Sequence, residues 1–193
     1  NPLMLAPVTG MPEIEPGADL AASIAAHAEL VDGDIVVVTS KIVSKAEGCA
    51  VELAAIEPSA FAAEFAGRWD KDPRLVEVVL RESVRVVRQI GPVLITETRH
   101  GFVCANAGVD QSSSGAEGRV LTLPIDPDGS ARTIRAGLAA SGLDVGVVIT
   151  DTFGRPWREA LKSLTHGGVH LGIDLPTRSG VGLARGDDPA HVA

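Results

Sequence analysis

The residues VGVVITDTFGRPWR, at positions 145–158, give the strongest indication of how this chain folds. The first five are apolar and mostly β-branched, which is typical of a buried strand. Asp151, Thr152, Arg155 and Arg158 come directly after them. Open α/β sheets hold ligands at the carboxyl ends of their strands, so we expect the chemistry of the protein here. Carboxylate and hydroxyl oxygens suit divalent cations, and guanidinium groups suit phosphate or carboxylate.

Length and composition predict a globular chain with a core of small side chains. Of the 193 residues, 45% are hydrophobic and only 3% aromatic. The net charge of −8, without a basic stripe, argues against a nucleic-acid partner. No apolar run approaches the roughly 18 residues of a membrane span, so we expect a cytoplasmic protein without a membrane partner. Cys49 and Cys104 form no CxxC pair, which argues against a zinc site or a disulfide.

Hydrophobic periodicity and turn residues predict the elements that surround this strand. Helices are expected at residues 19–30, where Asp19 is the N-cap, and at residues 58–65, 72–89 and 126–142. Strands are expected at residues 7–14, broken by a turn, at 35–39 with a continuation to 48, and as a hairpin at 93–98 and 102–103. The sequence has no internal repeat and no low-complexity linker.

Asp110 and Asp151 are the first candidates for a chemical role. Each comes after an expected strand, Asp110 after the small-residue loop NAGV at residues 106–109. Two carboxylates at strand ends could hold divalent ions between them, as phosphate-transfer sites require. Each aspartate could equally cap a turn. Position alone leaves both possibilities open.

A second candidate group comes after the strand at residues 35–39. Ser40, Lys41, Ser44 and Lys45 place hydroxyl and ammonium groups at the strand end, where they suit phosphate oxygens. Lysines on an edge strand also prevent edge-to-edge pairing of sheets, and the sequence does not separate these roles.

The histidines and the absent motifs limit the alternatives. His166 and His170 have i,i+4 spacing, but the two glycines between them argue against a metal-binding helix. His100, beside Gly101, could serve as an acid or base, although such a residue is more often an exposed turn histidine. The sequence has no GxxxxGK[ST] loop, no GxGxxG after a strand, no GxSxG and no HExxH.

Several blocks of this sequence resemble the coenzyme F420-0:γ-glutamyl ligase family, which also forms the N-terminal part of an actinobacterial two-domain ligase. The blocks are GDIVVVTSKIVSKAEG at 33–48, KDPR at 71–74, ETRHGFVCANAGVD at 97–110, LPIDPD at 123–128 and TDTFGRPWR at 150–158. The resemblance implies an α+β fold of mixed sheets with helices, and an intertwined homodimer.

The resemblance also implies an activity and a set of site residues. Family members join L-glutamate to coenzyme F420-0 with GTP, through an acyl phosphate. Asp110, Asp151 and Thr152 would bind two divalent metal ions, either Mn²⁺ or Mg²⁺. The resemblance also implies K⁺. GTP would be contacted by Met11, Pro12, Glu13, Ile14, Ser40, Lys45 and Ser113, the last a serine at a position where the family usually has asparagine.

The end of the chain departs from this resemblance. We expect residues 1–158 to form the ligase-like domain without its C-terminal part, and residues 159–193 to be a divergent tail, produced by truncation or a change of reading frame. Patterning is lost directly after Arg158, so we do not expect the tail to continue the sheet. The alternative function is an inactive or truncated homologue that binds nucleotide or metal without turnover.

Overall fold

The fold combines five α-helices with small sheets in the part of the chain that the structure, a computed structural model, describes: residues 4–111, 118–152 and 168–174. The helices are α1 (Leu20–His27), α2 (Ser40–Ala46), α3 (Ala60–Trp69), α4 (Pro73–Arg81) and α5 (Pro127–Ala140), with 3₁₀ turns η1 (Leu53–Ala55) and η2 (Asn106–Gly108). The strands are β1 (Ile35–Thr39), β2 (Ala50–Glu52), β3 (Ser83–Ile90), β4 (Val93–Thr98), β5 (Val103–Ala105), β6 (Arg119–Leu121), β7 (Gly146–Thr152) and β8 (Gly168–Asp174). The expected α+β class is confirmed.

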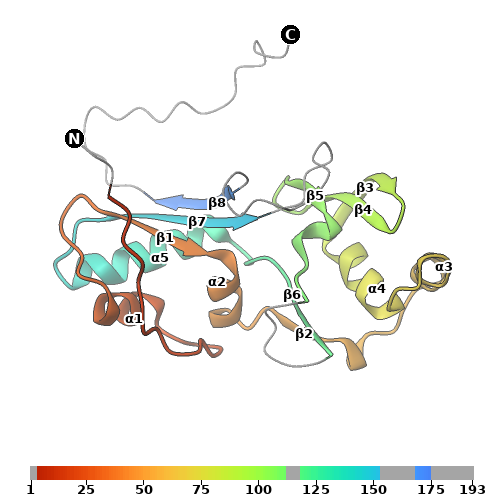
Figure 1. The fold of residues 1–193 in the computed structure, drawn as a ribbon, viewed down its shortest axis with the longest axis horizontal. Helices are drawn as coiled ribbons and strands as arrows, with labels where there is room; N and C mark the ends of the chain where they lie inside the picture. The colour runs from red at the N-terminus through yellow and green to blue at the C-terminus, as the bar shows by residue number, and fades with distance from the viewer. Residues whose placement is uncertain (1–3, 112–117, 153–167, 175–193) are drawn as a thin grey trace, which may run out of the picture.

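The first lobe consists of the sheet β1-β7-β8 with α1, α2 and α5 (Figure 1). β1 and β7 run parallel, and β8 is antiparallel to β7. Side chains of β1 alternate, so that Val36 and Val38 are buried while Ile35 and Val37 on the other face are exposed. The buried pair packs with Ile24, Leu138 and other apolar residues of α1 and α5 in one core.

The N-cap of α1 confirms a sequence prediction, and α5 is capped in the same way. Asp19 accepts a hydrogen bond from the Ala22 N–H at 2.9 Å, and Asp126 accepts one from the Gly129 N–H at 3.0 Å. Each carboxylate satisfies a backbone donor that the first turn of the helix leaves without a partner. The two helices pack against each other at the core side of the sheet.

The second lobe consists of the antiparallel sheet β3-β4-β5 with α3 and α4, whose core includes Phe65, Val76 and Leu94. Figure 1 shows the two lobes side by side, with the antiparallel pair β2–β6 between them. Cys104 of β5 is 1% exposed and belongs to the first-lobe core, so this strand links the two lobes. The predicted hairpin at 93–98 and 102–103 is confirmed by the pairing of β4 with β5.

Four predicted elements are wrong. The helix expected at 72–89 ends at Arg81, and the β-branched run after it forms β3 against β4. The strand expected to continue to residue 48 ends at Thr39, and α2 begins at Ser40. The helix buries Val43 in the first-lobe core. Residues 7–14 form no strand. Finally, the expected tail does contribute to the sheet, since β8 pairs with β7.

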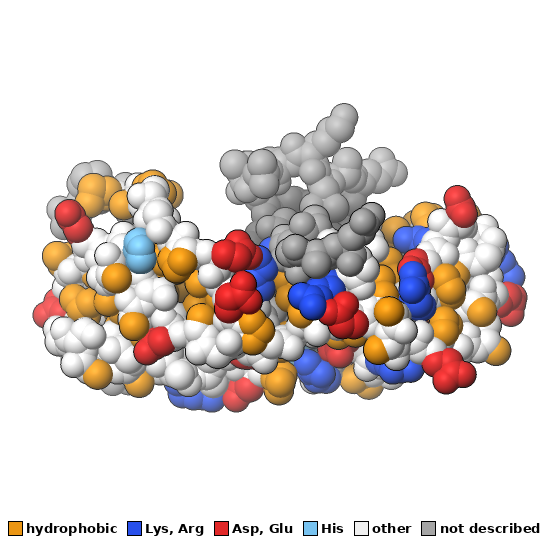
Figure 2. All heavy atoms as spheres, turned by 90° about the horizontal axis from the view of Figure 1, so that it is seen from below, with side chains coloured by type: hydrophobic (Ala, Val, Ile, Leu, Met, Phe, Trp, Pro, Cys, Tyr) orange, Lys and Arg blue, Asp and Glu red, His pale blue; other side chains and the backbone are white. Residues whose placement is uncertain are grey.

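Two further observations concern the described residues as a whole. None of their helices combines the length and the apolar character needed to cross a bilayer. On the face shown in Figure 2, acidic and basic side chains lie interspersed. Among the described residues, ion pairs such as Arg119–Glu52 and Arg85–Glu97 join side chains of opposite charge.

Candidate functional site

Parallel pairing of β1 with β7 brings Ser40 to Asp151. The register joins Thr39 to Thr150, so the next residue of each strand lies at the same edge of the sheet. The Ser40 hydroxyl donates a hydrogen bond of 2.7 Å to Oδ2 of Asp151, and Ser40 is 1% exposed. This is the carboxyl end of a parallel strand pair, where open sheets bind ligands.

Lys41, the next residue along α2, holds the second predicted metal ligand. Its Nζ lies 2.9 Å from Oδ2 of Asp110. The backbone of Asp110 is fixed by an isolated bridge to Leu121, with N–O distances of 2.9 and 2.8 Å. The structure therefore ties Asp110 and Asp151, which come from distant segments, to two consecutive residues in the first turn of α2.

The two cysteine thiols of the chain remain protonated at neutral pH. Burial, and to a lesser extent the negative charge of Asp151, raises the pKa of Cys104 to about 12. Burial and the neighbouring Glu47 carboxylate raise the pKa of Cys49 to about 11. Because the thiolate is the form that attacks or binds metal, neither cysteine is suited to these roles.

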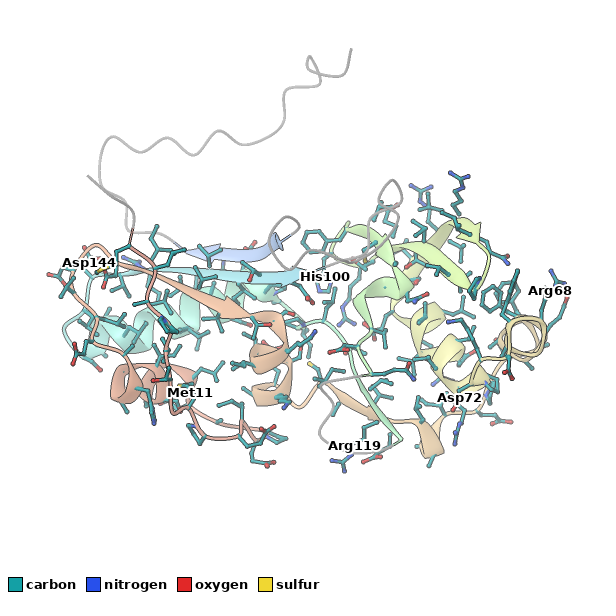
Figure 3. The ribbon with its side chains drawn as sticks, in the orientation of Figure 1. Met11, Arg68, Asp72, His100, Arg119 and Asp144 are labelled. Atoms are coloured by element: carbon teal, nitrogen blue, oxygen red, sulfur yellow. The ribbon has the colours of Figure 1, made fainter. Side chains whose placement is uncertain are left out.

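The N-terminal segment lies along α2, one turn beyond Ser40. The ammonium of Lys45 is paired with the carboxylate of Glu13, and the Gly17 N–H donates to the Ala46 carbonyl at 2.7 Å. The Ile14 side chain is buried in the first-lobe core, so only its main chain is available for a ligand. Met11, labelled in Figure 3, is partly buried against this core. Pro12 is exposed.

The structure thus brings predicted residues together in pairs along α2. Ser40 contacts Asp151, and Lys45 contacts Glu13. The sequence left Lys41 with two possible roles, phosphate binding and prevention of edge-to-edge pairing. In the structure Lys41 lies on a helix and contacts Asp110. The side chain of Thr152 and all of Ser113, Arg155, Arg158 and His166 lie outside the described residues, as does the side chain of His170.

His100 has a structural partner. Its Nε2 donates to the Pro124 carbonyl oxygen at 2.9 Å, and its ring packs near that of Phe102. It lies between the end of β7 and the second lobe (Figure 3), where it links the β4–β5 turn to the segment before α5. This contact gives Nε2 of His100 a structural role, whereas its buried Nδ1 has no hydrogen-bond partner among the described residues.

The donor set fits hard divalent cations. Around Ser40 the donors are carboxylate and hydroxyl oxygens, which Mg²⁺ and Mn²⁺ prefer. No group of three or more His, Cys, Asp or Glu side chains within the described residues could enclose a metal. Mg²⁺ is usually held by one or two carboxylates together with substrate phosphates, so two aspartates are a sufficient protein contribution.

Two cavities were not predicted from the sequence. One of about 310 Å³ lies beside Asp110 and is also lined by Lys71, from the KDPR block. The other, of about 700 Å³, lies between α1, α2 and α5 and contains none of the predicted site residues. Of these two cavities, only the first is lined by a predicted site residue, Asp110.

Comparison with known proteins identifies the family. A family model described as F420-0:Gamma-glutamyl ligase matches residues 9–184. The coenzyme F420:L-glutamate ligase of Methanopyrus kandleri is 51% identical over 167 residues, which cover 86% of this chain and 66% of that protein. The ligases of the same name from Methanothermobacter thermautotrophicus and Halobacterium salinarum are 45% and 46% identical, over 83% and 85% of this chain.

The chain spans about two thirds of the length of these relatives, 66%, 66% and 65% respectively. The matched range passes residue 158, and the domain boundary expected there stays a prediction. By the extent of the family match and by these identities, the chain belongs to the F420-0:gamma-glutamyl ligase family.

Proposed function

We propose that this chain carries the nucleotide- and metal-binding part of a ligase that joins L-glutamate to coenzyme F420-0 with GTP. The observation that carries the proposal is the attachment of Asp110 and Asp151 to consecutive residues of α2, in a member of this family. Ser40, Lys41 and Lys45 of α2, together with the two carboxylates attached to this helix, have the composition that a nucleoside triphosphate with its cations requires.

The proposed reaction has two steps. A carboxylate oxygen of F420-0 attacks the γ-phosphorus of GTP, and the bond to the β-phosphate oxygen breaks, which gives an acyl phosphate and GDP. The α-amine of L-glutamate then attacks the acyl carbon, the C–O bond to phosphate breaks, and the amine proton passes to solvent. The products are an amide and inorganic phosphate.

The residues of this chain bind and orient the nucleotide in that scheme. Ser40 and Lys45 would contact the phosphates, together with Met11, Pro12, Glu13 and Ile14 of the N-terminal segment and with Ser113. Lys45 would exchange its Glu13 partner for a phosphate oxygen, a small cost because Glu13 is largely exposed. Charge is the main obstacle in phosphoryl transfer, and a chain of net charge −8 must supply positive groups locally.

Asp110, Asp151 and Thr152 would hold two divalent ions, Mn²⁺ or Mg²⁺, and K⁺ would be an additional cation. When bound, the divalent ions neutralise the charge of the transferring phosphoryl group. We further propose that the active form is a homodimer in the cytoplasm.

The direct test is formation of the glutamylated coenzyme from F420-0, L-glutamate and GTP with Mn²⁺, measured by chromatography and by release of GDP. The informative variant is Asp151→Asn, whose amide oxygen can still accept the Ser40 hydrogen bond. We expect it to lose Mn²⁺-dependent turnover by several hundredfold or more while its thermal stability stays close to wild type.

Asp144→Asn is the matched control. Asp144 precedes the other end of β7 (Figure 3), where it pairs with Arg135 at 3.2 Å. Its activity should remain at the wild-type level. Full activity of Asp151→Asn would remove this residue from the site, and a folded wild-type protein that binds GTP without forming product would identify a non-catalytic homologue.

A further inference from the structure

The cavity beside Asp110 has the size and position of a site for a small second substrate. It measures about 310 Å³, near the lower end of the roughly 300–1,000 Å³ found for ligand pockets. Phe65, Val76 and Leu94 form its apolar floor, and Lys71, Asn106 and Asp110 add polar groups. A cavity of this volume can accommodate an amino acid.

The ammonium of Lys71 points to an anionic ligand. Three lysines lie in the described residues, and two of them are paired: Lys41 with Asp110 and Lys45 with Glu13. Within this part of the chain Lys71 has no ion-pair partner, although it lines a cavity with an apolar floor. The adjacent carboxylate, that of Asp72, is engaged by Arg74, whose Nη2 lies 2.6 Å from its Oδ2.

One wall of the cavity is built on an unusual backbone. Asn106 and Ala107 have φ values of 49° and 53°, in the left-handed region that residues with a Cβ rarely occupy. The side chain of Asn106 accepts a hydrogen bond from the Leu94 N–H at 3.2 Å, which holds this turn against β4. The wall next to Asp110 is therefore fixed by contacts to the sheet.

We propose that this cavity binds L-glutamate, with a carboxylate of the amino acid on Lys71 and its methylene groups on Phe65, Val76 and Leu94. The amine would then lie toward Asp110, the lining residue that also belongs to the proposed nucleotide site. This inference rests on the proposed function, because it assigns the second substrate of that reaction.

The test compares Lys71→Met, Lys71→Arg and the control Arg68→Met. Arg68 lies on α3, with its side chain exposed and paired with Glu64 (Figure 3), and it does not line the cavity. Loss of a charge-assisted hydrogen bond should raise the KM for L-glutamate about tenfold or more in Lys71→Met. The KM values for GTP and F420-0 and the kcat should stay within about twofold, Lys71→Arg should recover most of the loss, and Arg68→Met should resemble wild type.

Binding of ¹³C-labelled L-glutamate, observed by NMR in the presence of Mg²⁺ and a non-hydrolysable GTP analogue, tests the cavity without turnover. The wild-type protein should bind glutamate, and Lys71→Met should bind it about tenfold more weakly. If no product forms with any variant but this Lys71-dependent binding is present, the cavity assignment stands and the proposed reaction fails.

Three results would overturn the assignment. They are absence of glutamate binding by the folded wild-type protein, equal glutamate affinity of wild type and Lys71→Met, and a rise in the KM for F420-0 without a rise in that for glutamate. The last result would indicate that the cavity binds the carboxylate of F420-0 instead of L-glutamate.

Discussion

Ser40 and Lys41 are neighbours in the sequence, yet each contacts a different aspartate. The short hydroxyl of Ser40 reaches Asp151 on the strand beside it, and the long side chain of Lys41 reaches Asp110 beyond the sheet. One helical turn thereby collects two carboxylates from distant segments. The ammonium of Lys41 also places a positive charge beside the carboxylate of Asp110.

Replacing Lys41 tests whether the ammonium competes with a cation. In Lys41→Met we expect Mn²⁺ to bind severalfold more tightly, because breaking a partly exposed ion pair costs about 0.2–1 kcal/mol and the ammonium repels a bound cation. Electron paramagnetic resonance of free Mn²⁺ measures the affinity without nucleotide or turnover. Lys45→Met, which removes the same charge one turn away, is the control and should change the affinity less.

For individual residues, the sequence predicts only those contacts that follow from the pairing of two strands. Asp151 and Ser40 each end an apolar β-branched run, so they meet once the two runs pair in parallel. The contact of Lys41 with Asp110 could not be predicted, because it depends on how β6 holds the loop after η2. Lys71 shows no local signal of a cavity, which is formed by α4, β4 and η2 together.

Among the elements, α1 and α5 approach each other closely because Gly137 has no side chain. A Cβ placed on Gly137 would lie 2.4 Å from the Cβ of Ala21, closer than real Cβ contacts. Gly137→Ala should therefore destabilise the protein by about 1–3 kcal/mol, although alanine is the better helix former. Urea unfolding monitored by circular dichroism measures the change.

Two further variants make this prediction specific. Gly67→Ala, in α3, adds the same methyl group where no atom lies within 4 Å, and should stabilise by up to about 1 kcal/mol. Ala21→Gly combined with Gly137→Ala should recover most of the loss. Equal effects of Gly67→Ala and Gly137→Ala would show that the helices do not pack as described.

Helices α3 and α4 are joined by Glu77, which accepts hydrogen bonds from the Ser59 N–H at 3.0 Å and from Arg81 at 2.9 Å. These bonds, those from Ser59 foremost, lower the pKa of Glu77 from 4.5 to about 2. Because the pKa of Glu77 is lower in the folded state than in the unfolded chain, its ionised carboxylate stabilises the folded protein at pH values above the ordinary pKa of 4.5. This stabilisation is lost as the pH falls from 4.5 to about 2.

Glu77→Gln should therefore lower the free energy of unfolding at neutral pH, and the difference from wild type should vanish as the pH approaches the lowered pKa of about 2. Chemical unfolding at several pH values measures it. Glu64→Gln, which removes an exposed carboxylate from α3, is the control and should show a much smaller dependence on pH. A constant difference between wild type and Glu77→Gln across this range would contradict the assignment.

Residues 82–90 show why some elements could not be predicted. Val79 and Val86 continue the apolar spacing of α4, which favours one long helix. Residues 82–90 also contain Val84, Val86 and Val87, which favour a strand once β4 is available as a partner. At the boundary the Ser83 hydroxyl donates to the Val79 carbonyl at 2.6 Å, a side-chain bond at the helix end that no periodicity indicates.

At the scale of the whole molecule, β3 presents an exposed apolar surface. It is an edge strand of its sheet, and Val84, Val86, Val87 and Ile90 are between 42% and 67% exposed. Exposed apolar edges commonly mark contacts between chains. We expect sedimentation equilibrium to give about twice the chain mass of 19.9 kDa, and Val86→Lys to shift the protein toward monomer.

Ile125→Lys introduces the same charge at an exposed residue of the first lobe, and should leave the dimer intact. A monomeric wild-type protein would contradict the expected homodimer. A dimer that both variants preserve would place the contact on another surface.

The parallel pairing of β1 with β7 has a consequence for biosynthesis. Ser40 and Asp151 are 111 residues apart, a distance that a ribosome covers in about 6 to 22 s at roughly 5–20 residues per second. Within the described chain β7 is the only strand that pairs with β1, so the apolar run IVVVT emerges long before its hydrogen-bonding partner exists. A nascent chain therefore carries an open edge for seconds, during which chaperone capture would compete with misassociation.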